Sequence, residues 1–289
     1  MATPASPAAW RRWLASELRR LREDRGLAQK DAARECGWSG ARLSYLENGQ
    51  RPVVSDDLDK LLALYKVPDA DRSAYYAAVE SAQAEGWWER FEHLLAPWLP
   101  RYLGLEQGAV EIRTFEPLVV PGILQIADYA TAIMQGGLRR RSGREIERLV
   151  ELRLRRQDIL TRPDDPMRLD VVLDESVLHR SPIQPGVLAR QLEHVADMGE
   201  LDNVAIRVLP LERGLQAFSV GPFSILSFPA DQPDPLVYLE HRGGALWLED
   251  FDAIERYALA FDGLAELAFD PQVSLAMVRE TAERHARID

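Results

Sequence analysis

The sequence of 289 residues contains one cysteine, Cys36, and only three lysines among its 35 basic residues. A single cysteine can form neither an intrachain disulfide nor a thiolate zinc site, and it fits a reducing compartment. No apolar run approaches the roughly 20 residues that a membrane-spanning helix needs, and the opening residues MATPASPAAWRRW lack the apolar centre of a signal peptide. We therefore expect a cytoplasmic protein without a membrane segment.

Motifs of metal, nucleotide and catalytic chemistry are also missing. The five histidines show no HExxH spacing, and neither GxxxxGK[ST] nor GxGxxG occurs. Asp174, Glu175, Ser176 and His179 follow a predicted strand, but no second cluster supplies the catalytic partners they would need. We interpret Asp174 or Ser176 as the cap of a turn, Glu175 as solvated or paired with Arg180, and His179 as a surface residue. The sequence predicts no metal, no cofactor and no enzymatic activity.

The net charge of −11 is unevenly distributed along the chain. Residues 1–55 hold ten Arg or Lys against six Asp or Glu, whereas residues 82–289 hold 22 against 34. This asymmetry indicates that the N-terminal part meets phosphate while the acidic remainder is held away from it. The length allows two domains, which we place at residues 1–84 and 85–289.

Residues 26–52, GLAQKDAARECGWSGARLSYLENGQRP, predict two short helices joined by a turn. Ala33 is small where the first helix, residues 29–35, must let the second one approach. Gly37 permits the positive φ of a tight helix exit, and Ser39 can N-cap the second helix, residues 39–48. Leu43 and Leu46 then face inward, so the outer side and leading end carry Gly40, Ala41, Arg42, Ser44 and Tyr45.

This block resembles bacterial and phage repressors of the xenobiotic-response-element type over roughly residues 10–82. The resemblance is carried by Gln29, Ala33, Gly37, Ser39, Leu43, Leu46, Glu47, Asn48 and Gly49. It implies that Gln29 reaches phosphate or base, that Gly40, Ala41 and Tyr45 fall where bases are read, and that Asn48 and Arg51 grip the backbone. Because Gly40 and Ala41 have almost no side chain, specificity would lean on Arg42, Ser44 and Tyr45. The predicted DNA-binding residues are Gln29, Ser39, Gly40, Ala41, Arg42, Ser44, Tyr45, Asn48 and Arg51; the alternative is a helical bundle that binds no DNA.

Apolar stripes at helical spacing predict three further helices around this motif, at about residues 10–21, 55–65 and 70–82. The N-terminal domain is therefore predicted to be an all-α, five-helix, repressor-like domain. A monomer that reads one half-site would bind weakly, so we expect a homodimer on double-stranded DNA.

The remaining residues predict an α+β domain with a mostly antiparallel sheet, so that the chain is α+β overall. The expected helices are residues 97–108, 123–135, 145–161, 187–198, 251–269 and 273–286. The expected strands are residues 110–115, 168–174, 204–209, 223–228, 236–240 and 245–248. Between two of the helices, Arg139 to Gly143 forms a polar link, and its arginine run is either a solvated face or an auxiliary phosphate contact.

Residues 85–280 resemble the C-terminal domain of unknown function in a family of actinobacterial regulators, which includes WhiJ-like and antitoxin-like members. The resemblance rests on WWERF, FEPLVVPGILQIADYA, ELRLRRQDIL, VVLDESVLHR, NVAIRVLP, GPFSILSF and VYLE. It implies a regulator whose DNA binding is modulated through this domain, with a small cognate partner protein encoded nearby. Two alternatives stay open: a one-component regulator that senses a small molecule, and a DNA-targeted enzyme.

Overall fold

The computed structural model describes residues 6–137, 141–180, 184, 186–213, 221–229 and 235–288. The chain divides into two compact units. The N-terminal unit contains the residues up to Glu89, the segment Arg101–Gly108 and a short segment that starts at Phe228, and the sheet unit contains the rest. The N-terminal unit thus extends past the predicted boundary at residue 84 and includes a later helix.

The N-terminal unit begins with five α-helices, as the apolar stripes predict. They are α1 (Pro7–Asp24), α2 (Gln29–Glu35), α3 (Gly40–Glu47), α4 (Ser55–Leu64) and α5 (Asp69–Gln83). A sixth helix, α6 (Leu99–Gly108), packs in the same unit. Pro7 at the first position of α1 and acidic residues in the first turns of α4 and α5 favour these helix starts.

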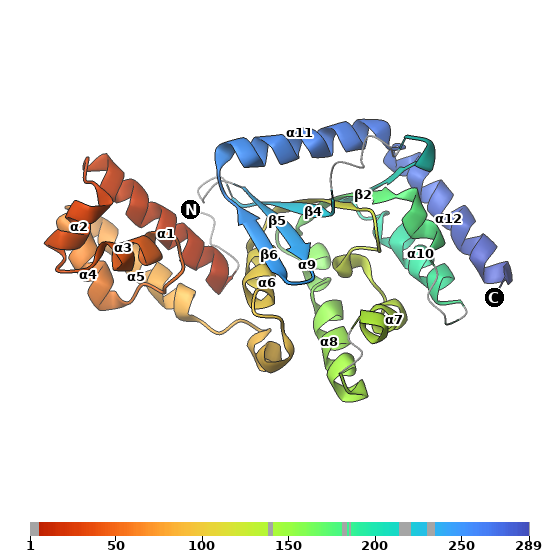
Figure 1. Cartoon of the computed structure of the whole chain (residues 1–289), viewed down its shortest axis with the longest axis horizontal. Helices are drawn as coiled ribbons and strands as arrows, with labels where there is room; N and C mark the ends of the chain where they lie inside the picture. Colours follow the sequence, from red (N-terminus) through yellow and green to blue (C-terminus); the bar gives the residue numbers. More distant parts are fainter. Residues whose placement is uncertain are drawn as a thin grey trace. The chain divides into compact units, whose positions relative to one another are not determined.

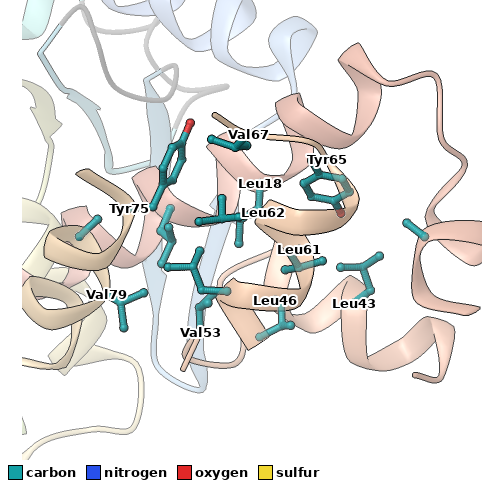
Figure 2. Packing of buried hydrophobic residues seen from close by; sticks show 14 of the residues in the cluster. Leu18, Leu43, Leu46, Val53, Leu61, Leu62, Tyr65, Val67, Tyr75 and Val79 are labelled. Atoms are coloured by element: carbon teal, nitrogen blue, oxygen red, sulfur yellow. The ribbon is translucent and has the colours of Figure 1, made fainter. Parts of the chain in front are cut away.

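One apolar core holds α1 to α5 together. Leu18 of α1, Leu43 and Leu46 of α3, and Leu61 and Leu62 of α4 are fully buried in it. Figure 2 shows these side chains converging from separate helices, with Tyr65, Tyr75 and Val79 around them. Because no single helix could bury its stripe alone, this packing fixes how α3 is presented by the unit.

The sheet unit combines six strands with helices. Its strands are β1 (Glu111–Glu116), β2 (Arg168–Asp174), β3 (Val204–Leu209), β4 (Phe223–Ser227), β5 (Leu236–His241) and β6 (Gly244–Leu248). Its α-helices are α7 (Ala127–Gly137), α8 (Gly143–Arg155), α9 (Asp158–Thr161), α10 (Val187–Met198), α11 (Phe251–Leu267) and α12 (Pro271–Ile288). The structure also contains the 3₁₀ helices η1 (Glu89–Leu94), η2 (Gly122–Leu124) and η3 (Glu175–His179).

The strands form one mixed sheet in the order β3-β2-β1-β4-β5-β6. β1, β2 and β3 pair in parallel, whereas β4, β5 and β6 continue the sheet by antiparallel pairing. Figure 1 shows α11 along one face of this sheet and α7 and α8 on the opposite face. Val171, Val172 and Leu173 of β2 are consecutive and all fully buried, as expected for a parallel strand that is covered on both faces.

Most predicted elements of this unit are confirmed, and two predicted helices need correction. The helix expected at 123–135 begins only at Ala127, because residues 122–124 form η2. The helix expected at 145–161 starts earlier and stops at Arg155, with the separate turn α9 after it. Its start is a capping box: Ser142 Oγ accepts from the backbone N–H of Glu145, whose carboxylate accepts from the backbone N–H of Ser142. Within the predicted polar link, Arg139 and Arg140 lie outside the described residues.

Candidate nucleic-acid interface

The turn between α2 and α3 has the geometry that the sequence predicts. Gly37 has a φ of 72°, which glycine adopts without strain, and the N–H of Trp38 donates to the C=O of Ala33 at 2.8 Å. Ser39 is the N-cap of α3, and its Oγ accepts from the N–H of Arg42 at 3.3 Å. The turn therefore closes α2 onto α3 by local hydrogen bonds.

The inner face of the two helices is also confirmed. Ala33, Leu43 and Leu46 are almost completely buried, and Cys36 packs against the same core while remaining partly accessible. Burial raises the pKa of the Cys36 thiol, so this cysteine is not an activated nucleophile.

A buried ion pair holds α3 to α1. Arg22 donates to both carboxylate oxygens of Glu47, from Nε at 2.7 Å and from Nη2 at 3.1 Å. The side chains of Arg22 and Glu47 are only 8% and 1% exposed, and Arg22 also donates to the C=O of Leu27. Gln29, at the start of α2, donates to the same Glu47 carboxylate at 2.9 Å. Three helices are thus joined at one carboxylate.

In the sequence, Glu47 is one of the residues that carry the resemblance to repressors, whereas Arg22 belongs to no motif. The signal was nevertheless present, because Arg22 lies four residues after Leu18 and Glu47 lies four residues after Leu43. Residues four apart share a helix face, so both charges lie on inward-facing stripes. A charge on each of two buried stripes indicates a pair, since an unpaired one would be costly to bury.

Arg42 has intramolecular partners. Its Nη2 is paired with the buried carboxylate of Asp57 in α4, and its guanidinium carbon lies 4.6 Å from the centre of the Trp38 ring. Lys60 approaches the same ring at 5.8 Å. These contacts join α3, the preceding turn and α4. They give Arg42 a structural role, whereas the sequence predicts a contact with bases.

The exposed side of α3 begins with two residues that have little or no side chain. Gly40 and Ala41 are exposed, and a Cβ added at Gly40 would meet nothing within 4 Å. Tyr45 projects from this side with 51% of its surface accessible. Asn48 follows at the end of α3, where its amide donates to Ser44 Oγ at 3.3 Å.

Arg51 lies just beyond the C-terminal end of α3. Its backbone N–H donates to the C=O of Tyr45 at 3.1 Å, and its side chain is exposed and forms no ion pair within the part of the chain that the structure describes. Lys30 and Arg34 of α2 are also exposed. Arg34 also pairs with Asp31 at 2.9 Å. Exposed positive side chains thus lie in the helix before α3 and just after its end, and such side chains are suited to phosphate contacts.

Glu116 of the sheet unit carries a carboxyl group with a strongly raised pKa. Glu116, at the end of β1, is surrounded by protein although partly accessible, and this burial, together with repulsion from Glu240, raises its pKa to about 8. The nearby Arg156 acts in the opposite direction. Glu240 accepts a long hydrogen bond of 3.4 Å from Trp98 Nε1.

The polar residues after β2 form a turn, as interpreted. Asp174 caps η3, and its Oδ1 accepts from the N–H of Ser176 at 2.9 Å. The suggested pairing of Glu175 with Arg180 is wrong, because Glu175 accepts from the N–H of Leu211 while Arg180 donates to a backbone oxygen. Among residues 6–137, 141–180 and the later described segments, no three potential metal ligands gather. Nor does the described chain contain a helix long and apolar enough to cross a membrane.

Arginines in and just before α8 have protein contacts. Arg141 pairs with Glu145 and donates to the C=O of Leu94, and the guanidinium of Arg148 lies 5.3 Å from the Phe91 ring centre. This favours a structural and solvated role over a phosphate contact.

Comparison with protein-family models gives two matches along the chain. Residues 13–74 match the model described as "Helix-turn-helix domain", and residues 99–280 match the model described as "Domain of unknown function (DUF5753)". The first match contains α2, the turn and α3, and the second covers more than half of the chain. No curated protein and no solved structure matches.

Proposed function

Because the chain belongs to the family defined by this domain of unknown function and carries a helix-turn-helix domain before it, we propose that it is a sequence-specific transcriptional regulator. It acts as a homodimer on double-stranded DNA in the cytoplasm and is not an enzyme. The observation that carries the proposal is the capped, exposed α3 beside the flanking cations of α2 and Arg51.

Within the proposed interface, the residues have different roles. Tyr45 and Ser44 face base edges, Gly40 and Ala41 allow the backbone of α3 to approach the groove closely, and Arg51 and Asn48 bind phosphate. Gln29 acts near the start of α2, and Ser39 caps α3. Arg42 contributes by holding α3 to α4 through Asp57.

The test begins with selection of preferred duplexes from a random library by the full chain. Tyr45→Ala should reduce the preference for the selected duplex over a scrambled one, and Tyr76→Ala, which removes another exposed tyrosine of the same unit, serves as the matched control. Arg51→Ala should weaken both duplexes equally and lower the slope of log affinity against log salt by about one. If both Tyr45→Ala and Arg51→Ala bind as the wild type does, the interface is assigned to the wrong face.

We further propose that residues 85–289 modulate DNA binding through a small cognate partner protein, as in antitoxin-like regulators. Large apolar side chains exposed on the sheet unit support a protein partner: Phe251 and Leu259 of α11 are 74% and 65% exposed. The alternative, sensing of a small molecule, is supported by the partly accessible Glu116 with its raised pKa.

Purification of the full chain from its native host, followed by mass spectrometry under non-denaturing conditions, separates these two modes of control. A stoichiometric small protein supports the partner, and a retained metabolite supports the sensor. If the full chain emerges with neither a small protein nor a metabolite, neither mode of control holds.

A further inference from the structure

The helix α6 links the two family matches in an unexpected way. Its residues open the sequence range of the domain of unknown function, yet it packs in the N-terminal unit against α1. A Cβ at Gly104 would lie 2.4 Å from Cβ of Ala8, and a Cβ at Gly108 would lie 2.6 Å from Cβ of Ala9. Because residues four apart share one helix face, the two glycines form a continuous seam in which only hydrogen side chains fit.

Polar and aromatic contacts secure this seam, which consists of Ala8, Ala9, Gly104 and Gly108. Ser6, the N-cap of α1, accepts from the N–H of Ala9 at 3.2 Å and donates its hydroxyl proton to the C=O of Gly104. Trp88 is buried against Gly104, since its Cζ2 lies 3.1 Å from the position of an added Cβ. The start of α1 is therefore fixed by α6 through packing and a buried hydrogen bond.

The other end of α1 is fixed to the candidate recognition helix. Arg22 lies in the last turn of α1 and forms the buried pair with Glu47 of α3. An α-helix of 18 residues is about 27 Å long and behaves as a rod over that length. The contacts of α6 and of α3 therefore lie at opposite ends of α1.

The hydrogen bond between Val110 and Ser227 joins two segments that each lie next to a residue in contact with α1. β1 begins three residues after Gly108, and the N–H of Val110 donates to the C=O of Ser227 at the end of β4. Phe228 follows directly, and its ring centre lies 4.8 Å from the guanidinium carbon of Arg12 in α1. Two neighbouring strands of the sheet therefore lead by short covalent paths to α1.

We infer that α6 is a functional part of the DNA-binding unit: its docking at the glycine seam holds α1 and α3 in the orientation that binds DNA, and the domain of unknown function controls affinity through this docking. The inference rests on the proposed DNA-binding function and adds to it the element through which control is exerted.

The test measures the DNA affinity of full-chain variants in which a methyl group is added at Gly104 and then removed from Ala8, on the opposite side of the seam. Gly104→Ala places a methyl against Ala8 and should weaken binding to the selected duplex on the order of tenfold, a typical size for coupling between sites. Gly263→Ala makes the same change in α11, where nothing lies within 4 Å of the new Cβ, and should leave affinity unchanged. The double variant Ala8→Gly with Gly104→Ala returns the methyl count of the seam to that of the wild type and should recover affinity to within about threefold of wild type.

The rescue separates a specific seam from a general loss of folding, because the double variant carries more changes than the single one yet is expected to bind better. A folded Gly104→Ala variant with wild-type affinity overturns the inference, and so does a weak single variant that the double change fails to rescue. A wild-type chain that selects no duplex at all defeats the proposed function itself, which is a different result from either.

Discussion

Replacing Glu47 by glutamine should selectively destabilise the N-terminal unit. The change removes the charge that two nitrogens of Arg22 contact at 2.7 and 3.1 Å, in a place where both side chains are nearly inaccessible. Breaking a buried ion pair costs about 3–5 kcal/mol, because the remaining charge stays buried without its partner. Glutamine retains an acceptor and Glu23 still lies 3.3 Å from Arg22, so we expect a loss of about 3 kcal/mol.

A loss of this size is large for a unit of about 100 residues. It corresponds to a decrease of roughly 10–20 °C in the melting temperature of the unit, measured by calorimetry on the full chain. Glu80→Gln, an exposed substitution of the same type in α5, serves as the control and should melt as the wild type does. A Glu47→Gln transition within about 2 °C of that control would refute the reasoning.

Stability and DNA binding should separate when the pair is replaced as a whole. Arg22→Met with Glu47→Leu removes both charges, and apolar replacements of buried pairs are often neutral or stabilising. The amide of Gln29 nevertheless loses its acceptor, so DNA affinity should remain below that of the wild type. A stable double variant with full affinity would show that Gln29 does not need Glu47 to position it.

Two further predictions concern a titrating carboxyl and a helix crossing. The pKa of Glu116 is raised on folding from its ordinary value near 4.5 to about 8, so the folded chain binds more protons between these values and stability should fall as pH rises from about 5 to 8. Glu116→Gln should flatten this decrease, which is on the order of 4 kcal/mol at about 1.4 kcal/mol per pKa unit, in urea unfolding at several pH values; an unchanged pH profile would argue against the raised pKa. Ala33→Leu should overpack the contact between α2 and α3 at a cost of about 1–3 kcal/mol, and an unchanged melting temperature would contradict that close contact.

The sequence predicts local elements well where the apolar periodicity agrees with the positions of glycines, prolines and capping residues. The expected helix at 187–198 coincides with α10, which lies between Gly186 and Gly199, and the expected strand at 168–174 coincides with β2. The helix-turn-helix can be predicted from the sequence for the same reason, since Gly37, Ser39 and the two leucines of α3 each satisfy a local steric demand.

What the sequence could not supply depends on partners far apart in the chain. The sequences of the single strands do not show which strands become neighbours, or that β1, β2 and β3 pair in parallel while β4, β5 and β6 are added by antiparallel pairing. The break after α8 is accompanied by a tertiary contact, in which Gln157 Nε2 donates to the C=O of Gln125 at 2.7 Å. Likewise, the pairing of Arg42 with Asp57 becomes visible only once α3 and α4 are packed together.

The open space at Gly40 gives the protein a position at which its target preference can change independently of its fold. Gly40 does not have a positive φ, lies on the surface, and has no neighbour within reach of an added Cβ. In the proposed interface, a polar side chain at this point would replace the close backbone approach by a side-chain contact to DNA, without disturbing the core or the cap of α3. If α3 binds DNA as proposed, duplicated copies of this chain can diverge toward different operators through this one residue, while the same packed unit continues to present it.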